Sequence, residues 1–254
     1  MYKLLHGDCL ELMKKIPDKS IDMILCDLPY GTTACKWDTI LPFDLLWGGY
    51  NRIIKENGAI VLFGSEPFSS KLRLSNLGMY KYDWIWCKSR ALGFTNAKNK
   101  PMNKHENISV FSRGTCANGS NNKMIYNPQG LIEVNKIVCG IKECKADSTE
   151  GGHKFARKSH KKEYIQQFTN YPNQLLYFNN EGKTVHPTQK PVALLEYLIK
   201  TYTNEGELVL DNCMGSGSTG VACINTNRNF IGMELDDKYF SIAKERIEKA
   251  NSEV

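Results

Sequence analysis

A glycine-rich loop close to the C-terminal end is the feature that most constrains how this chain can fold. The segment LVLDNCMGSGSTG places Gly215, Gly217 and Gly220 in the pattern G-x-G-x-x-G, between a strand-like run and a helix-like run. Glu234 follows at the end of the next strand-like run. This order is that of a dinucleotide fingerprint, in which loop amides meet an anionic group and the acid binds ribose hydroxyls. It predicts an α/β sheet with a ligand beyond the carboxyl ends of its strands.

The loop comes late in the chain, and its position affects the expected topology. Only one helix-like segment, residues 236–250, follows Glu234, so no later strand can pair beside residues 229–234. The first strand-like run, YKLLHGD at residues 2–8, is the natural partner. We therefore expect a circularly permuted sheet in which the two ends of the chain lie close together, as surface termini permit.

Short apolar runs alternate with amphipathic segments on either side of a less regular middle region, which is typical of βαβ architecture. The predicted strands are residues 2–8, 20–27, 59–64, 82–88, 106–112, 207–211 and 229–234. The predicted helices are residues 9–16, 43–58, 190–202, 218–226 and 236–250. Residues 114–183 are rich in Asn, Gly, Ser and Lys and show weak periodicity, so we expect an inserted irregular region or a small module there.

Four acids end predicted strands, namely Asp8, Asp27, Asp211 and Glu234. Because ligands of open α/β sheets lie beyond the carboxyl ends of the strands, these acids should converge on the ligand. They would repel the pyrophosphate of a dinucleotide. They would favour a ligand with an ammonium, a sulfonium, ribose hydroxyls and a single carboxylate, which is the charge pattern of S-adenosyl-L-methionine. Its carboxylate could lie at the loop amides and the helix N-terminus.

The net charge of +6 is unevenly distributed along the chain. Between Lys88 and Lys123 there are seven basic residues and one acid, Glu106, and residues 153–162 add five basic residues and no acid. Aromatic residues such as Phe94 interleave with these cations, which favours a nucleic-acid partner over a lysine-rich solvated surface. The candidate contacts to nucleic acid are Lys88, Arg90, Lys98, Lys100, Lys104, Lys154, Arg157 and Lys158.

Other compositional signals are weaker. Nine cysteines form no regular framework and indicate reduced thiols in a cytosol. Two thiols and two imidazoles (Cys139, Cys144, His153 and His160) could ligate zinc, but their spacing fits no common finger, and we expect no metal. No apolar stretch of about 18 residues indicates a membrane span.

Several motifs together resemble the amino-methylating DNA methyltransferases. They are DLPY at 27–30, AIVLFGSEPF at 59–68, YDWIWCK at 82–88, HENISVF at 105–111, HPTQKP at 186–191 and the glycine loop. Their order is similar to the β-type arrangement, in which the catalytic motif precedes the cofactor loop. The resemblance covers residues 1–113 and 184–250. It implies a Rossmann-like, circularly permuted, seven-stranded mixed sheet, with a catalytic half at 1–113, a target-recognition region at 114–183 and a cofactor-binding half at 184–254.

The resemblance assigns the catalytic role to Asp27, Leu28, Pro29 and Tyr30. An exocyclic adenine amine is a poor nucleophile because its lone pair is delocalised into the ring. The Asp27 carboxylate and the Leu28 carbonyl can each accept one of its N–H bonds and free that lone pair. Pro29 fixes the turn, and Tyr30 offers a face for stacking of a flipped-out base. Leu28 departs from the Asp-Pro-Pro-Tyr form of the family, but a backbone carbonyl tolerates the change.

The resemblance also implies the cofactor contacts. Asp8 and Cys9 would flank the adenosyl base, and Glu234 would bind the ribose. Residues 211–220 would surround the methionine part, and Thr188, Lys190 and Pro191 would close the pocket near its carboxylate. The loop contacts are Asp211, Asn212, Met214, Gly215, Gly217 and Thr219. Ordinary structural roles remain as alternatives, since Lys190-Pro191 also suits a helix start and Asp8 suits an N-cap.

The expected activity is therefore transfer of a methyl group from S-adenosyl-L-methionine to N6 of a flipped-out adenine in a specific DNA sequence. Members acting on cytosine N4 more often carry Ser at the first motif position, so Asp27 favours adenine. Methylation of cytosine N4 and a non-catalytic DNA-binding protein on the same scaffold remain alternatives. Expected partners are double-stranded DNA, with single strands as an alternative, a restriction endonuclease and a second copy of the chain. The expected location is the cytoplasm of a bacterial or phage-infected cell, with the nucleoid.

Overall fold

A computed structural model describes residues 1–31, 38–139, 163–181 and 189–253 of the chain. The chain divides into two compact units, of which the larger comprises Met1–Asn127 and Asn173–Val254 and the smaller comprises Pro128–Pro172. The smaller unit is narrower than the predicted region 114–183, because the segments on either side of it pack with the larger unit. The role of that region in target recognition stays a prediction.

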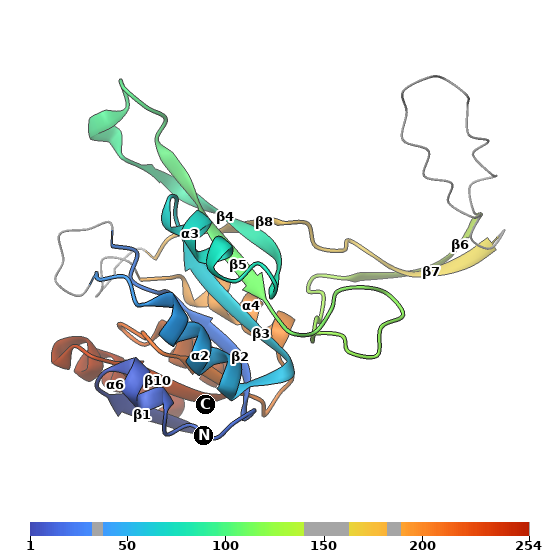
Figure 1. Cartoon of the computed structure of the whole chain (residues 1–254). Coiled ribbons are helices and arrows are strands. Elements are labelled where there is room, and N and C mark those ends of the chain that lie inside the picture. Colours follow the sequence, from blue (N-terminus) through green and yellow to red (C-terminus); the bar gives the residue numbers. More distant parts are fainter. Residues whose placement is uncertain (32–37, 140–162, 182–188, 254) are drawn as a thin grey trace. The chain divides into compact units, whose positions relative to one another are not determined.

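The larger unit is built on a mixed sheet whose strand order is β1-β10-β9-β2-β3-β5-β4-β8 (Figure 1). Its strands are β1 (Tyr2–His6), β2 (Ile21–Cys26), β3 (Ile54–Gly64), β4 (Tyr80–Leu92), β5 (Asn103–Phe111), β8 (Leu175–Phe178), β9 (Leu208–Asp211) and β10 (Asn229–Glu234). Only β5 pairs in antiparallel fashion with its neighbours β3 and β4. The sheet is thus of the mixed, Rossmann-like kind that the resemblance implied.

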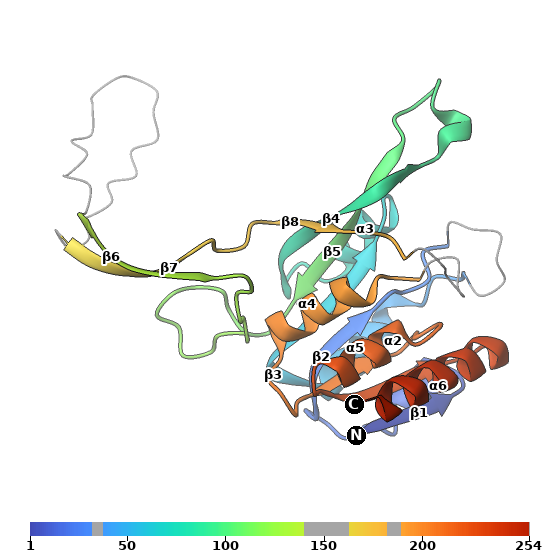
Figure 2. The same ribbon diagram turned by 180° about the vertical axis from the view of Figure 1, so that it is seen from behind.

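The strand at the start of the chain pairs with the last strand. β1 lies parallel to β10, with Tyr2 opposite Phe230 and His6 opposite Glu234. Both views show the two chain termini close together at this end of the sheet (Figures 1 and 2). The circularly permuted arrangement predicted from the late glycine loop is therefore confirmed.

Helices cover both faces of the sheet. They are α1 (Cys9–Met13), α2 (Phe43–Ile53), α3 (Phe68–Ser75), α4 (Val192–Tyr202), α5 (Ser218–Asn225) and α6 (Asp237–Ser252). All six residues of β2 are buried, and successive strand side chains point to opposite faces. Ile24 belongs to the apolar cluster that contains residues of α1, α2 and α3, whereas Leu25 belongs to the cluster that contains residues of α4, α5 and α6. The continuous apolar run in β2 therefore follows from its central place between two helical layers.

The structure corrects the sequence predictions at three places. The sheet has eight strands rather than seven, because Leu175–Phe178 adds the edge strand β8 parallel to β4. The helix predicted over 43–58 ends at Ile53, because Ile54 already pairs with Ile21 in the sheet. Helix α3 was not predicted, because its short sequence FSSKLRLS buries few apolar side chains.

The smaller unit contains an antiparallel pair of strands, β6 (Ile132–Cys139) and β7 (Glu163–Thr169). Ile132 lies opposite Thr169, and Cys139 lies opposite Glu163. The smaller unit is thus a β-hairpin in its described part, whereas β8, which also falls within the predicted region 114–183, belongs to the larger unit. Across the described part of the chain, no helix is both long and apolar enough to span a membrane.

Candidate active site

A cavity of about 720 Å³ lies at the carboxyl ends of the parallel strands. Its lining includes all four strand-ending acids, Asp8, Asp27, Asp211 and Glu234. The predicted convergence of these acids is therefore confirmed. Tyr30 from the first part of the chain and Gly215 from the last part line the same cavity, so the DLPY turn and the glycine loop share one site.

The DLPY turn follows β2 directly and is held by packing and hydrogen bonds. Leu28 is buried in the layer formed with α2 and α3. The Tyr30 ring stacks on Phe68, with ring centroids 4.9 Å apart and planes 25° apart. The Gly31 amide donates to Asp38 Oδ1 at 2.8 Å. Phe68 thus packs against one face of the Tyr30 ring.

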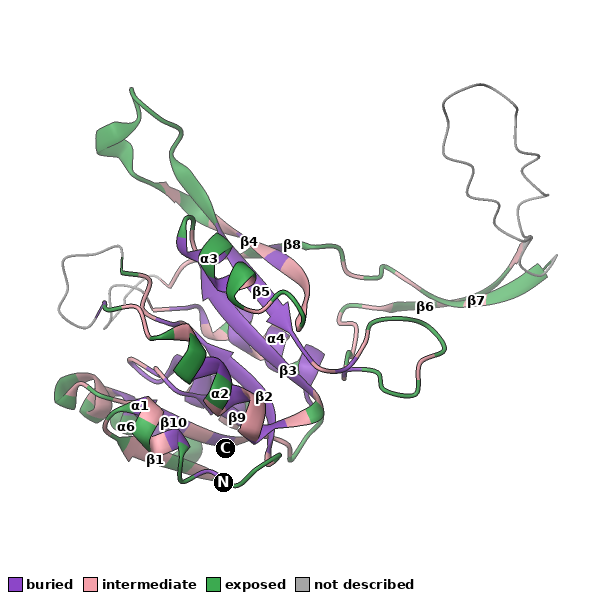
Figure 3. Cartoon of the chain, in the orientation of Figure 1, coloured by how far each residue is buried: buried purple, intermediate pink, exposed green. Residues whose placement is uncertain are grey.

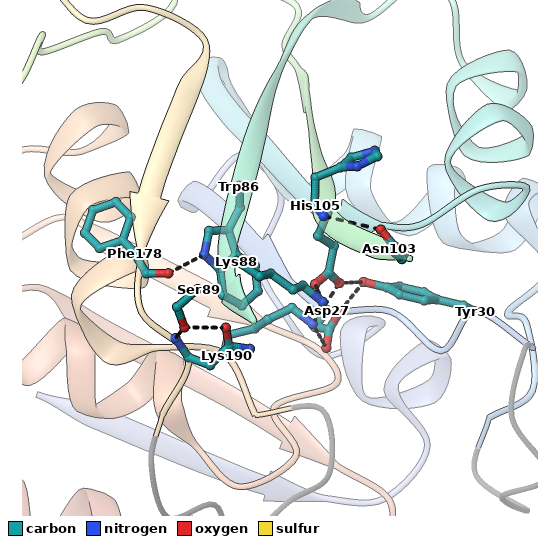
Figure 4. Close-up of polar contacts among 11 residues, drawn as sticks. Asp27, Tyr30, Trp86, Lys88, Ser89, Asn103, His105, Phe178 and Lys190 are labelled. Carbon is teal, nitrogen blue, oxygen red and sulfur yellow. Dashed lines mark hydrogen bonds and ion pairs between the residues drawn. The ribbon is translucent and has the colours of Figure 1, made fainter. Parts of the chain in front are cut away.

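Asp27 belongs to a cluster of charged side chains drawn from four elements (Figure 4). Lys190, which precedes α4, contacts Asp27 Oδ2 at 2.6 Å and Glu106 Oε1 at 3.1 Å through its Nζ atom. The Tyr30 hydroxyl lies 2.6 Å from Asp27 Oδ1 and 2.7 Å from Glu106 Oε1. Since a phenol carries one proton, it donates to one carboxylate at a time. The cluster therefore contains a proton that two acids can share.

Burial and charge act in opposite directions on these groups. Burial raises the pKa of Asp27 by more than the Lys190 ammonium lowers it. Burial would also raise the pKa of Glu106, but the ammonium groups of Lys190 and Lys88 outweigh it and lower that pKa to about 2. For Lys190 the two carboxylates outweigh burial and raise the pKa, so this lysine stays charged. Burial, and then the carboxylates of Asp27 and Glu106, raise the pKa of the Tyr30 hydroxyl well above its ordinary value of 10.

Lys88 completes the cluster instead of facing solvent. Its Nζ atom lies 2.9 Å from Glu106 Oε2 and 5.0 Å from the centroid of the Trp86 ring. The Trp86 indole N–H in turn donates to the carbonyl oxygen of Phe178 in β8 at 2.9 Å. The prediction that Lys88 contacts nucleic acid is not favoured by this position, because its charge already pairs with a buried acid.

Glu106 was not among the predicted site residues. It is 3% exposed and lies in β5. Its sequence signal was its place as the single acid within the basic stretch, next to the apolar run of a predicted strand. An acid that enters a buried strand needs a cationic partner, and here Lys88 and Lys190 provide two.

The glycine loop joins β9 to α5 through backbone geometry that other residues rarely adopt. Gly215 and Gly217 have φ angles of +50° and +78°. A Cβ atom on Gly217 would lie 2.9 Å from the Cβ atom of Ala243 in α6. Glycine is therefore required at Gly217 both by its φ angle and by the close approach of α6.

Two acids hold the loop in place. Asp211 accepts hydrogen bonds from the Thr219 hydroxyl at 2.6 Å and from the Cys213 amide at 3.1 Å. Glu234 accepts from the backbone amides of Gly215, Leu235 and Asp236 at 2.8, 2.9 and 2.9 Å. Burial raises the pKa of Asp211 to about 7 and also raises that of Glu234. Both acids thus have a structural role, and any cofactor contact from them is additional.

The far end of the cavity contains thiols and an amide. Asp8 is the N-cap of α1, because its carboxylate accepts from the Leu10 amide at 2.8 Å. Asn212 Oδ1 accepts from the Tyr50 hydroxyl at 2.5 Å, and its Nδ2 lies 3.6 Å from Cys9 Sγ. A hydrogen bond to Cys213, together with burial, raises the pKa of Cys9 well above its usual range. These thiols therefore stay protonated at neutral pH.

The structure brings most of the predicted site residues together. Lining the cavity are Asp8, Cys9, Asp27, Leu28, Pro29, Tyr30, Lys190, Asp211, Asn212, Met214, Gly215, Thr219 and Glu234. Thr188, Lys154, Arg157 and Lys158 lie outside the described residues, as do three of the four considered zinc ligands. No group of His, Cys, Asp or Glu side chains within the described residues is arranged to hold a metal ion. The individual roles assigned to these residues stay predictions.

Solved structures with the same fold define the class of protein. The complex of M1.HpyAVI with S-adenosyl-L-methionine matches with a TM-score of 0.63 and 25% identity, covering 97% of this chain and 100% of that one. The PvuII DNA methyltransferase, described as cytosine-N4-specific, matches with a TM-score of 0.67 over 99% of this chain and 92% of that one. Its 16% identity shows a common fold alone. The fold is that of S-adenosyl-L-methionine-dependent DNA methyltransferases.

Sequence comparison gives the family. The type II methyltransferase M.HpaI of Haemophilus parainfluenzae is 27% identical over 259 residues, which cover 97% of this chain and 74% of the relative. M.HinfI of Haemophilus influenzae is 27% identical over 277 residues, covering 96% of this chain and 67% of the relative. The chain belongs to the DNA methylase family of N6 and N4 amino-methyltransferases, whose model matches residues 21–245.

The residues of the cavity fit the cofactor that this family uses. The cavity volume lies in the range of small-molecule sites, about 300–1,000 Å³. The amides at the N-terminus of α5 can meet one carboxylate, and the surrounding acids suit a ligand that also carries positive charge. We expect the loop at 211–219 to hold the methionine part and Glu234 to lie at the ribose. When bound, S-adenosyl-L-methionine supplies an electrophilic methyl group on its sulfonium.

Proposed function

We propose that this protein methylates the N6 amine of adenine within a specific sequence of double-stranded DNA. The observation that carries the proposal is the position of Asp27, a half-buried acid that lines the cavity shared by the DLPY turn and the glycine loop. An acid at the first motif position favours adenine over cytosine by resemblance to the family. Methylation of cytosine N4 is the alternative, and the same product analysis distinguishes the two.

Asp27 and Leu28 are proposed to orient the amine. The carboxylate and the backbone carbonyl accept its two N–H bonds, which turns the nitrogen lone pair toward the methyl donor. Positioning and electrostatics of this kind supply most of the catalysis for such a transfer. An incoming amine competes with Lys190 for Asp27 Oδ2, and Glu106 Oε1, 3.1 Å from Nζ, offers the lysine an alternative partner.

Asp27 is also proposed to accept the proton that the amine loses after methylation. The direction of its pKa shift supports this role, because burial makes the carboxylate more basic than an exposed one. The Tyr30 hydroxyl lies between Asp27 and Glu106 and can turn its proton toward either acid. The charge on Asp27 can therefore change while the hydroxyl keeps one hydrogen-bond partner.

Tyr30 is proposed to hold the flipped-out base by stacking. Phe68 supports one face of its ring at 4.9 Å, so the ring cannot retreat when a base presses against the other face. Stacking of a base on an aromatic side chain contributes about 1–3 kcal/mol. This is enough to offset much of the cost of removing the base from the duplex.

Exposed cations near the site support DNA as the substrate. Arg90, Lys98, Lys100 and Lys104 are all exposed on the β4–β5 hairpin. We further propose that the protein acts on the DNA of a bacterial or phage-infected cell, in the cytoplasm with the nucleoid. A partner restriction endonuclease and a homodimer are part of the same proposal, by resemblance to restriction-modification systems.

The test is nucleoside analysis of DNA from cells that express the protein, with single-molecule sequencing to find the modified position. We expect N6-methyladenine in one short sequence context. The Asp27→Ala variant should lose methyl transfer while it still binds the cofactor. The matched control is Asp44→Asn, an exposed acid on α2, which should leave transfer unchanged. N4-methylcytosine, or undiminished transfer by Asp27→Ala, would contradict the proposal.

A further inference from the structure

The β4–β5 hairpin continues beyond the sheet as a two-stranded ribbon with an unusual apolar tip. Phe94 begins a single turn of 3₁₀ helix there and is 82% exposed, and the flanking Leu92 and Met102 are 55% and 44% exposed. Figure 3 shows the projecting part of the hairpin as almost entirely exposed. Three large apolar side chains on one projecting tip gain nothing from solvent, so the tip is built to be covered by a partner.

The charge of the ribbon indicates which partner covers it. From Ser89 to His105 there is no acid, and four cations occur, namely Arg90, Lys98, Lys100 and Lys104. All four are exposed. The apolar tip needs a partner with an apolar interior, such as stacked aromatic rings. The surrounding cations need anions, such as phosphates, on the outside of the same partner. This is the chemistry of a DNA duplex, in which phosphates bind Lys and Arg and base steps accept apolar wedges.

The two strands of the ribbon leave the sheet at residues that belong to the charged cluster around Asp27. Lys88 and Glu106, which pair at 2.9 Å, are the positions from which the two strands leave the sheet. Figure 4 shows Asn103 and His105 beside this cluster, on the strand that returns from the tip. A strand from Lys88 to Leu92 spans at most about 13 Å. This reach is comparable with the width of a DNA groove, about 12 Å for the major groove.

We propose that the ribbon enters a groove of the bound duplex and that Phe94 inserts into the base stack next to the target, filling the space left by the flipped-out base. The inference rests on the proposed function and adds to it a residue that displaces the base. Leu92 and Met102 pack beside the inserted ring. The four cations hold the ribbon on the phosphates. Phe94 then occupies the position that the base leaves in the stack, and Tyr30 stacks on the base after it is flipped out.

The proposal is tested with Phe94→Ala on two duplexes that contain the sequence found by sequencing. In one duplex the target base is paired, and in the other it faces a mismatch. A mispaired base is already partly unstacked and needs less displacement. We expect methyl transfer by the variant to fall at least ~10-fold on the paired duplex and to recover to within ~2-fold of the wild type on the mismatched one.

A second measurement follows the base itself. With 2-aminopurine at the target position, the wild type should raise the fluorescence on binding, Phe94→Ala should not, and Phe94→Leu should do so in part. Leu74→Ala is the matched control, since Leu74 is 69% exposed on α3 and lies outside the ribbon. It should behave as the wild type in both assays.

The outcomes separate this proposal from the proposed function. If Phe94→Ala transfers methyl groups normally to the paired duplex, or loses transfer equally on both duplexes, the wedge is refuted while methylation stands. An equal loss would instead indicate a contact that holds DNA or another partner. A wild-type protein that methylates no DNA would refute the proposed function, and the wedge with it.

Discussion

Glu106 balances the charge of the cluster that contains Lys88, Lys190 and Asp27, and its replacement by glutamine should have a large effect on stability. Glutamine keeps the shape of the side chain and removes its charge. Lys190, 3.1 Å from the Glu106 carboxylate, would keep Asp27 as an acidic partner, whereas Lys88, 2.9 Å from that carboxylate, would lose its partner in the cluster. Removal of one partner from a buried ion pair leaves uncompensated charge, which typically costs about 3–5 kcal/mol.

The pKa of Glu106 gives an independent magnitude. A fall from 4.5 in the unfolded chain to about 2 in the folded protein corresponds to about 3 kcal/mol of stability. Because the folded-state pKa is the lower one, this stabilisation is fully present above about pH 4.5. It is lost as the pH falls toward 2, and about half of it remains at pH 3. The two approaches agree on a loss of about 3 kcal/mol at pH 7.

The assay is denaturant unfolding of the wild type and Glu106→Gln at pH 7 and pH 3. The difference in free energy of unfolding should be about 3 kcal/mol at pH 7 and about half of that at pH 3. Glu56→Gln is the matched control, because Glu56 also pairs with two cations, Lys19 and Arg113, but at the surface, where such pairs contribute little. A Glu106→Gln variant as stable as the wild type at pH 7, or a difference that does not change with pH, would refute the reasoning.

Two further predictions concern the cofactor loop. Gly217→Ala should lower stability by about 1–3 kcal/mol and weaken cofactor binding, because Gly217 has a φ of +78° and its new Cβ would lie 2.9 Å from that of Ala243. Gly48→Ala, in α2 with open space around it, should not destabilise, and thermal unfolding with calorimetric titration compares the two. Because the folded-state pKa of Asp211, about 7, lies above its ordinary value of 3.8, stability relative to Asp211→Asn should fall as the pH rises from about 4 to 7 and then level off. Unfolding measured at pH 4, 6 and 8 checks this, and a difference independent of pH would contradict it.

Local patterns predicted seven of the strands of the sheet and the acids that line the cavity, but not the edge strand β8. The glycine loop and the strand after it predicted a parallel neighbour for β10, and the strand-like run at residues 2–8 is the segment that pairs there. The acids at the ends of the predicted strands were expected to line the cavity, because the carboxyl ends of parallel strands lie at one edge of the sheet. These inferences depend on the periodicity of short stretches of sequence and on general rules of sheet topology.

The charged cluster could not be predicted, because its contacts join distant parts of the chain. Lys190 and Asp27 are far apart in sequence, and nothing near either residue indicates that they form an ion pair. Lys88 looked like one more cation of a basic stretch until the sheet placed it against Glu106. The early end of α2 has a similar cause, because pairing of Ile54 with Ile21 overrides helical periodicity.

The pairing of β1 with β10 also bears on how the molecule is made. During synthesis, residues 2–6 leave the ribosome long before their partners, residues 230–234. At ~5–20 residues per second, the first strand waits roughly 10 to 45 s for its neighbour. Until then one border of the half-built sheet is open, and a nascent chain that stalls before β10 leaves that border available to other strands.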